Sequence, residues 1–305
     1  MTLSRSMLFV PATQPAMMAK AARSAADAVC LDLEDAVAPA LKADARGEAV
    51  RALRELEFGG RLRIVRVNAV DTPWAARDLL AVMDGAAGRV DAIMLPKASG
   101  ARDVQFVDTL LAQLEAGAES PTRVGIIAQV ESAAGFVHVN AIAAASSRLT
   151  TLVFGAGDYA ASMRMPLANI GMRDEFDAAV PGDRWHAVMH AIVAAARAHG
   201  LACWDGPYAN YTDSAGLKEA CRLARAMGFD GKQCIHPAQL AVTNTVFSPG
   251  EAEVARARQV VAAWDAAQQG GQGATGIDGV MIDAVNVRMA RTILAAHEAI
   301  TLRGS

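Results

Sequence analysis

Residues 124–158 read VGIIAQVESAAGFVHVNAIAAASSRLTTLVFGAGD and contain two short aliphatic runs, each followed by an acidic residue. The first run, residues 124–130, leads directly into Glu131. The second run, residues 151–154, leads through glycines to Asp158, and an Ala-rich segment separates the two runs. Short apolar runs of this kind indicate buried strands. The stretch therefore predicts one repeat of a parallel α/β sheet.

The same alternation continues along the whole chain. Strand-like runs lie at residues 7–11, 28–33, 63–67, 92–95, 124–130, 151–154, 202–205 and 233–235. Helical patterns lie between them, among others at residues 16–25, 42–55, 74–83, 101–114, 187–198 and 214–227. Eight strands that alternate with helices predict an α/β fold, the (β/α)8 TIM barrel.

Polar side chains stand where these runs end. In chain order they are Glu34, Asp35, Arg66, Lys97, Glu131, Asp158, Asp205 and His236. In a TIM barrel the C-terminal ends of the strands meet on one face, and functional side chains project from that face. We therefore expect these residues to converge on one site.

The composition suits this fold and excludes several classes of function. The 305 residues are 53% hydrophobic and only 5% aromatic, which favours α/β layers over a β-sandwich. The formal charge is −3 and the basic residues are scattered, so neither a nucleic-acid partner nor a membrane surface is expected. The four cysteines form no C-x-x-C pair, which indicates buried free thiols. No apolar run reaches the ~20 residues of a membrane helix and the start lacks a secretory pattern, so we expect a cytoplasmic protein.

The chain continues beyond the eighth strand, so we divide it into a barrel domain, residues 1–248, and a C-terminal helical extension, residues 249–305. The extension contains a helical pattern at 251–268, a Gly-rich break at 270–276, the motif DGVMID at 278–283 and a final helical pattern at 285–299. A hinge before an acid-containing segment predicts a lid or a subunit-bridging arm. A packing appendage is the alternative.

Glu131 and Asp158 end consecutive strands, so neighbouring positions in the barrel can bring both carboxylates together. Two hard oxygen ligands, with room for water and a chelating substrate, are what Mg²⁺ prefers. Two unrelated acids on the barrel rim are the alternative. The segment GAGDYA also matches a loose dinucleotide fingerprint, but no clean helix follows it, and a nicotinamide site is therefore not favoured.

Arg66 suits a substrate carboxylate held between a guanidinium and a divalent cation, and an ion-paired rim arginine is the alternative. One of Glu34 and Asp35 could hold metal-bound water, while the other caps the following turn. Lys97 could bind a phosphate or form a Schiff base. The pair His186 and His190 lacks the Glu of H-E-x-x-H. We therefore interpret the two residues as solvated or core histidines and not as metal ligands.

At these residues the sequence resembles the citrate lyase β-subunit-like family of the HpcH/HpaI aldolase superfamily, which includes malyl-CoA and citramalyl-CoA lyases. The matching segments are RSMLFVPA, DAVCLDLEDAV, RVN, MLPK, VESAAG, VFGAGD, GFDGKQCIHPAQ and DGVMID. The resemblance implies a TIM barrel that binds Mg²⁺ through Glu131 and Asp158, with Arg66 gripping the oxo-acid portion of the substrate. It also implies an acid/base role for Asp283 in DGVMID, and a homotrimer.

The chain departs from the family pattern at several places. Ala12 stands where the family usually has Gly, and Gln129 and Ser132 flank Glu131 where Ile-Glu-Thr is commoner. Trp204, before Asp205, and the segment PYANYTD also differ. These departures leave the metal ligands in place but put the substrate side of the pocket in doubt.

The resemblance implies an enzyme, a carbon–carbon lyase of the oxo-acid-lyase type. Its substrate would be a 3-hydroxyacyl-CoA such as citramalyl-CoA or malyl-CoA, and its products acetyl-CoA and a 2-oxo acid, which is pyruvate, glyoxylate or oxaloacetate. Asp35 and Arg66 join Asp283 as candidate catalytic residues, and Glu34 as a candidate substrate-binding residue. Arg5 and Lys20 are candidate partners for the CoA phosphates.

Three alternatives stay open at this point. A citrate lyase β subunit would cleave citryl thioesters of an acyl carrier protein to oxaloacetate and the acetyl thioester. A malyl-CoA thioesterase would use the same metal and acid to admit water. A barrel without catalysis would serve as a metabolite-binding scaffold, and the intact Glu131, Asp158, Arg66 and Asp283 argue against it.

Overall fold

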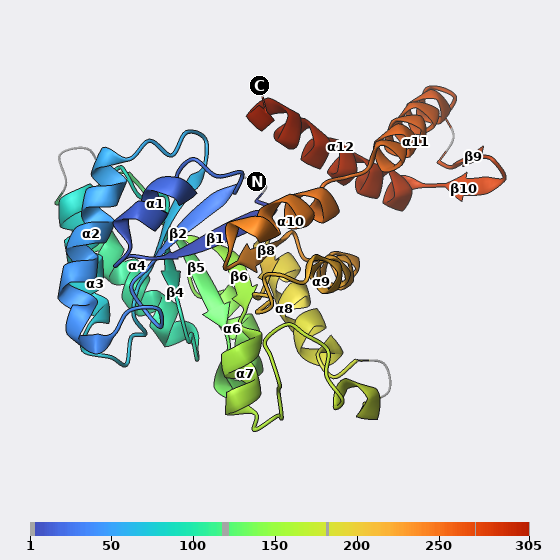
Figure 1. Ribbon diagram of the computed structural model, residues 1–305. Helices are drawn as coiled ribbons and strands as arrows, with labels where there is room; N and C mark the ends of the chain where they lie inside the picture. The colour runs from blue at the N-terminus through green and yellow to red at the C-terminus, as the bar shows by residue number, and fades with distance from the viewer. Residues whose placement is uncertain (1–3, 118–121, 181–182, 272, 305) are drawn as a thin grey trace. The chain divides into compact units, whose positions relative to one another are not determined.

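The computed structural model describes residues 4–117, 122–180, 183–271 and 273–304 (Figure 1). Eight parallel strands close into a barrel in chain order, and the eighth pairs with the first. This confirms the predicted (β/α)8 fold. The strands are β1 (Ser6–Pro11), β2 (Ala28–Asp32), β3 (Leu62–Arg66), β4 (Ala92–Leu95), β5 (Gly125–Val130), β6 (Leu149–Phe154), β7 (Ala202–Asp205) and β8 (Gly231–Cys234).

Helices surround the barrel (Figure 1). They are α1 (Pro15–Ala21), α2 (Lys42–Glu55), α3 (Ala75–Ala86), α4 (Ala101–Ala116), α5 (Ala133–Val137), α6 (Val139–Ala143), α7 (Ala156–Ser162), α8 (His186–Ala198), α9 (Ser214–Ala226) and α10 (Leu240–Phe247), with 3₁₀ turns η1 (Pro39–Leu41), η2 (Asp177–Ala179) and η3 (Pro237–Gln239). The longer helices bury one face, as their apolar spacing predicts. Within the described residues, no helix combines the length and apolar character needed to cross a membrane.

The barrel interior changes from apolar to polar toward the C-terminal ends of the strands. An apolar cluster fills it, formed by Met7, Ala28, Cys30, Ile64, Ala92, Met94, Ile127, Val153 and Trp204. Side chains alternate along a strand, so the residue two positions further on also faces inward. In β2, β3 and β5 that residue is Asp32, Arg66 and Gln129, respectively. The strand period therefore gathers buried polar groups directly below the mouth of the barrel.

The N-terminal end of the barrel is closed by contacts near β1 and β8. Arg5 binds both carboxylate oxygens of Asp27 through its guanidinium, at 2.8 Å each, and its backbone N–H also donates to that carboxylate. Gly231 begins β8 where a Cβ would lie 2.7 Å from the carbonyl oxygen of Arg5. Only glycine lets the two backbones approach this closely, so Gly231 permits β8 to close against the segment before β1.

The four cysteines are free and buried, as predicted. Cys30 lies inside the barrel, and burial raises the pKa of its thiol far above the ordinary value. Burial likewise raises the pKa of Cys234, to about 12, and the pKa values of Cys203 and Cys221. These thiols are protonated packing groups.

The chain divides into two compact units, the barrel unit Ser4–Asn244 and a C-terminal unit that begins at Thr245. Two helices, α11 (Glu251–Gln269) and α12 (Ala284–Gly304), pack on each other in the C-terminal unit. Its small core contains Ala257, Val260, Ile282, Val287 and Ala290.

The DGVMID motif lies in a β-hairpin that the sequence did not predict. Its strands are β9 (Thr275–Ile277) and β10 (Val280–Ile282), so β9 starts within the expected Gly-rich break. Asp278 and Gly279 connect them with φ of 53° and 77°. An Asp-Gly pair with both φ values positive is the favoured two-residue hairpin turn.

Two adjacent leucines on α3 differ in burial and show which face of this helix packs against the barrel. Leu79 is fully buried, whereas Leu80 is 41% exposed. We expect Leu79→Ala to lower the free energy of unfolding by about 2–5 kcal/mol, because it removes buried methyl groups and leaves a cavity. Leu80→Ala is the matched control and should change it by less than about 0.5 kcal/mol. Equal losses in denaturant unfolding of the two variants would contradict this orientation of α3.

Candidate active site

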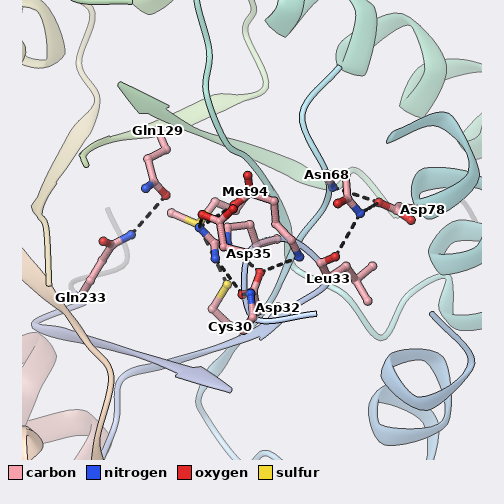
Figure 2. A network of polar contacts seen from close by, with 12 residues as sticks. Cys30, Asp32, Leu33, Asp35, Asn68, Asp78, Met94, Gln129 and Gln233 are labelled. Carbon is pink, nitrogen blue, oxygen red and sulfur yellow. Dashed lines mark hydrogen bonds and ion pairs between the residues drawn. The ribbon is translucent and has the colours of Figure 1, made fainter. Parts of the chain in front are cut away.

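Arg66 ends β3 and lies inside the barrel, 8% exposed, against Asp32, which Figure 2 labels. Its Nε and Nη2 donate to the two carboxylate oxygens of Asp32, each at 2.7 Å. The third nitrogen, Nη1, lies 2.8 Å from Oε2 of Glu34, and the guanidinium lies over the ring of Phe9, 5.1 Å from its centre. Two of the three guanidinium nitrogens are therefore committed to Asp32, and Nη1 faces the carboxylates that follow β2.

The loop after β2 is tied down by several hydrogen bonds. The Asp32 carboxylate accepts the backbone N–H groups of Glu34 at 2.9 Å and of Ala36 at 3.2 Å. Lys42 donates through Nζ to the carbonyl oxygens of Leu33 and Glu34, at 2.7 Å each. The prediction that Glu34 or Asp35 caps this turn is therefore corrected. Asp32 caps it, because the strand alternation points its carboxylate under the turn.

Lys97 bridges the two acids that follow β2. Its Nζ binds Oε1 of Glu34 and lies 3.1 Å from Oδ1 of Asp35. Burial alone would lower the pKa of Lys97, but these hydrogen bonds and charges outweigh it and raise that pKa. An amine that attacks a carbonyl must be neutral, with a lowered pKa. The geometry therefore does not support the Schiff-base role considered for Lys97.

The pKa values of Glu34 and Asp35 are shifted in opposite directions. Burial raises the pKa of Glu34, although Arg66 and Lys97 act against it. Asp35 is exposed, and the hydrogen bond from Lys97 and the charge of Arg66 outweigh its partial burial, so that its pKa is lowered. Asp35 is thus a charged acid at the rim of the site, and its catalytic role stays a prediction.

Glu131 follows β5 and is 2% exposed. Its Oε1 accepts the backbone N–H of Lys97 at 2.7 Å, and its Oε2 accepts Nε2 of Gln129 at 2.5 Å. Burial, and then the charges of Asp158 and Glu34, raise the pKa of Glu131 to about 8. Asp158 lies exposed in the first turn of α7. The charge of Asp158 therefore acts on the buried Glu131 carboxyl, and a metal site shared by the two residues stays a prediction.

Glu131 and Asp158 together are a donor set that fits Mg²⁺. Both are hard oxygen donors, and a buried carboxylate whose pKa is raised by a neighbouring carboxylate is relieved when a cation binds between them. Within the described ranges, no cluster of three or more His, Cys, Asp or Glu could hold a metal. Two protein carboxylates plus water and substrate is the arrangement that Mg²⁺ tolerates and that Zn²⁺ sites rarely use.

Asp205 does not join this site, although it ends β7. It is paired in register with Lys232 of β8, and Lys232 Nζ binds its carboxylate in a buried ion pair. Trp204 belongs to the interior cluster, so the alternation turns Asp205 away from the barrel axis. The expectation that every strand end contributes to one site is wrong for β7.

The structure places Arg5, one of the two predicted CoA partners, away from the mouth of the barrel. Arg5 lies before β1, at the opposite end of the strands from Arg66 and Glu131, and its guanidinium is occupied by Asp27. Its predicted role is therefore corrected to a structural one. Lys20 lies exposed in the last turn of α1, a helix that leads away from the C-terminal end of β1. A CoA contact by Lys20 stays a prediction.

Asp283 belongs to the C-terminal unit and caps α12. Its Oδ1 accepts the backbone N–H groups of Val285 at 2.9 Å and of Asn286 at 3.2 Å. In return, Asn286 accepts the backbone N–H of Asp283 at 2.9 Å. The acid therefore has a structural function of its own, and its acid/base role stays a prediction.

A cavity of about 450 Å³ adjoins the site and includes Glu34, Asp35, Lys42, Asn68 and Lys97 in its lining. A larger cavity of about 890 Å³ lies beside β7 and α9. Its charged lining groups already pair with one another, as in the Asp205–Lys232 and Arg173–Asp183 ion pairs. The smaller cavity borders Glu34, Asp35 and Lys97, three of the polar residues at the strand ends.

Sequence reasoning missed the roles of Asp32 and Gln129. Both face the barrel interior because they lie two residues from another inward-facing position. An Asp inside a buried strand needs a cation, and Arg66, at the end of the next strand, was the available partner. That signal could have identified the pair, whereas the role of the neutral Gln129 became visible only through its contacts.

The comparisons place this geometry in a family. Residues 5–237 match the HpcH/HpaI aldolase/citrate lyase family, and the chain belongs to it. Over 302 residues it is 40% identical to the L-malyl-CoA/beta-methylmalyl-CoA lyase of Rhodobacter capsulatus, covering 97% of this chain and 95% of the relative. Over 296 residues it is 39% identical to the (3S)-malyl-CoA thioesterase of Cereibacter sphaeroides, with the same coverage of 97% and 95%.

Solved structures agree with the family assignment. The CitE protein of Mycobacterium tuberculosis, crystallised with magnesium, acetoacetate and coenzyme A, superimposes with a TM-score of 0.76 at 33% identity. The alignment covers 97% of this chain and 98% of that one. RipC of Yersinia pestis gives a TM-score of 0.65 at 29% identity, over 82% of this chain and 98% of that one.

The raised pKa of Glu131 predicts a pH-dependent stability of the metal-free protein. Below pH 4.5, the ordinary value, both folded and unfolded chains carry the proton. Between pH 4.5 and about 8 the unfolded chain releases it while the folded chain retains it, so stability is lost as pH rises through this window. The loss is at most about 1.4 kcal/mol per pH unit.

Glu131→Gln removes this titration. In EDTA, the melting temperature of the variant minus that of the unmodified protein should increase as the pH is raised from 5 to 8.5. The pair measured at pH 5 is the control, because both chains then carry a neutral side chain at position 131. A difference in melting temperature that stays constant across this range would contradict the assignment.

Proposed function

We propose that this protein is a Mg²⁺-dependent carbon–carbon lyase. It cleaves a 3-hydroxyacyl-CoA such as malyl-CoA or citramalyl-CoA to acetyl-CoA and a 2-oxo acid, and it catalyses the reverse condensation. Relatives named as malyl-CoA lyases that match over 95% of their own length support this proposal. The CitE and citrate lyase beta subunit structures of Mycobacterium tuberculosis, which are complexes of magnesium with acetoacetate, pyruvate or oxaloacetate, support an oxo-acid site.

One observation of this chain carries the proposal. Glu131 is buried at the mouth of the barrel with its pKa raised to about 8 by burial and by Asp158, in the same site as the buried guanidinium of Arg66. A cation that binds here would replace the proton of Glu131 and relieve the repulsion from Asp158, while the guanidinium favours an anion. Both groups together suit a substrate that carries a carboxylate beside an oxygen ligand.

In this proposal Glu131 and Asp158 hold the Mg²⁺, which when bound supplies Lewis-acid stabilisation of negative charge on substrate oxygens. Arg66 binds the carboxylate of the oxo-acid portion through Nη1, the nitrogen that Asp32 leaves available. Glu34, which lies 2.8 Å from Nη1, must yield that place as substrate enters. Lys97 retains Glu34 and Asp35 at the rim while this exchange occurs.

Cleavage breaks the bond between the thioester α-carbon and the hydroxyl-bearing carbon. The hydroxyl loses its proton and becomes the carbonyl of the oxo acid, while the α-carbon leaves as a thioester enolate and takes up a proton. Asp283 is the proposed acid/base for that carbon, on the strength of the DGVMID resemblance. The lid or bridging role of the C-terminal unit and the homotrimer belong to the same proposal.

A thioesterase is the second candidate, because a relative with that name is 39% identical over nearly the whole chain. Hydrolysis uses the same metal and carboxylates but admits water to the thioester carbonyl. A citrate lyase β subunit, which acts on an acyl carrier protein, is a third candidate, and structures under that name also match the chain. A non-catalytic scaffold would turn over none of these substrates.

The purified protein should release acetyl-CoA from malyl-CoA or citramalyl-CoA in the presence of Mg²⁺ and not in EDTA. Phenylhydrazine should trap the oxo acid as a hydrazone and thereby identify it. Release of free CoA without a hydrazone would instead establish the thioesterase. Turnover of a citryl carrier-protein thioester alone would establish the third candidate, and no turnover of any of the three would leave the scaffold.

Asp283→Asn separates the acid/base role of this residue from its capping role. Asparagine caps helices as well as aspartate does, so α12 and the melting temperature should be unaffected. Turnover should fall by roughly 10²–10⁴, the loss typical of a missing general acid/base, while metal binding is retained. Full activity of this variant, or a loss of metal binding, would count against the assignment.

A further inference from the structure

Two buried glutamines face each other inside the barrel, next to the proposed metal ligand. Gln129 of β5 and Gln233 of β8 are 4% and 3% exposed. Gln233 donates through Nε2 to Oε1 of Gln129 at 3.4 Å, and Gln129 donates through Nε2 to Oε2 of Glu131 at 2.5 Å. Figure 2 shows the two amides pointing toward each other from opposite strands. A chain of hydrogen bonds thus crosses the barrel and ends on the Glu131 carboxylate.

The orientation of the Gln129 amide is fixed by the Glu131 carboxylate. Its oxygen can only accept and its nitrogen can only donate. A reversed amide would place its oxygen against the carboxylate of Glu131, and its nitrogen against the donor of Gln233. The contact with the Glu131 carboxylate would then fail in an interior where unpaired polar groups are costly. Glu131 therefore keeps the amide nitrogen of Gln129 on its side, which leaves the Gln129 oxygen to accept from Gln233.

Glu131 is held from two further sides. Its Oε1 accepts the backbone N–H of Lys97, whose φ of 52° is the left-handed conformation that non-glycine residues rarely adopt. Behind the carboxylate lies Gly155, where a Cβ would come within 2.5 Å of Oε2 of Glu131 and 2.9 Å of Nε2 of Gln129. Each carboxylate oxygen therefore has one fixed donor, and a glycine provides the space for the amide and the acid together.

We propose that Gln129, whose amide oxygen accepts from Gln233, is the positioning residue for Glu131 as a metal ligand. The inference rests on the proposed function, because it takes Glu131 as a ligand of the divalent cation. Groups that hydrogen-bond to a metal ligand orient it, and their loss typically weakens metal binding by 10–100-fold. Gln129 touches neither substrate nor metal in this role; it acts through the carboxylate.

Gln129→Met tests this role, since methionine keeps the length of the side chain and removes the donor. Mn²⁺ is the probe, because carboxylate sites that suit Mg²⁺ also bind Mn²⁺ and its free fraction can be read by EPR. We expect the dissociation constant for Mn²⁺ to rise by about 10–100-fold in Gln129→Met. Gln233→Met should weaken binding in the same direction by a smaller factor, because it removes only the second contact.

Ile127→Val is the matched structural control. Ile127 lies two residues before Gln129 on the same strand and faces the same apolar cluster. This variant should lower the melting temperature while the dissociation constant for Mn²⁺ is unchanged. Equal weakening of Mn²⁺ binding by Ile127→Val and Gln129→Met would show a general loss of packing and overturn the positioning role.

Glu131→Gln distinguishes failure of this inference from failure of the proposed function. If the unmodified protein binds no Mn²⁺, or if Glu131→Gln binds it as tightly as the unmodified protein, the metal site itself is wrong and both proposals fall. If Glu131→Gln loses Mn²⁺ while Gln129→Met binds it normally, the function stands and the positioning role is overturned. Should Gln129→Met not fold, Gln233→Met decides, and undiminished Mn²⁺ binding by that variant would overturn the role.

Discussion

The ion pair between Arg66 and Asp32 is the interaction on which the rest of the site depends. The two residues are register partners on β2 and β3, so the strands themselves bring the charges together inside the barrel. A buried ion pair compensates for lost hydration only with good geometry and further hydrogen bonds. Here the pair is bidentate, and the Asp32 carboxylate also accepts two backbone N–H groups.

From this pair a continuous polar network reaches the mouth of the barrel. Asp32 fixes the turn that presents Glu34, which lies between Arg66 and Lys97. The backbone of Lys97 in turn binds Glu131, which the two glutamines hold from below. Few of these groups could change alone, because each is a partner that keeps another buried polar group satisfied. The apolar cluster nearer the N-terminal ends of the strands packs beneath this network.

The barrel and the acids at the strand ends could be predicted from the sequence because both follow from the periodicity of apolar residues. A strand ends where its apolar run ends, and parallel strands end on one face, which is why Arg66, Glu131 and Glu34 were found together. The same reasoning failed for Asp205, since the side of a strand that a residue faces depends on register with its neighbours. It failed for Arg5 because charge alone does not reveal the partner, Asp27, that occupies its guanidinium at the N-terminal end of the barrel.

Other features needed coordinates. The hairpin around Asp278 and Gly279 was concealed by a glycine-rich composition that resembles a loose linker, although Asp-Gly is itself a hairpin signal. Gln129 had been noted only as a departure from the family pattern. Its neutral amide accepts a hydrogen bond from Gln233, which lies 104 residues further along the chain. The two residues meet only when the barrel closes.

The buried state of the four cysteines has a consequence for the proposed thioester substrate. Thioesters exchange their acyl group readily with thiolates, and a reactive cysteine near bound acyl-CoA would become acylated by transthioesterification. Cys30 lies under Arg66 in the barrel, yet burial keeps its proton in place. An acyl-CoA bound at the mouth, as proposed, would meet no thiolate from these four cysteines, so its acyl group would be preserved for the reaction.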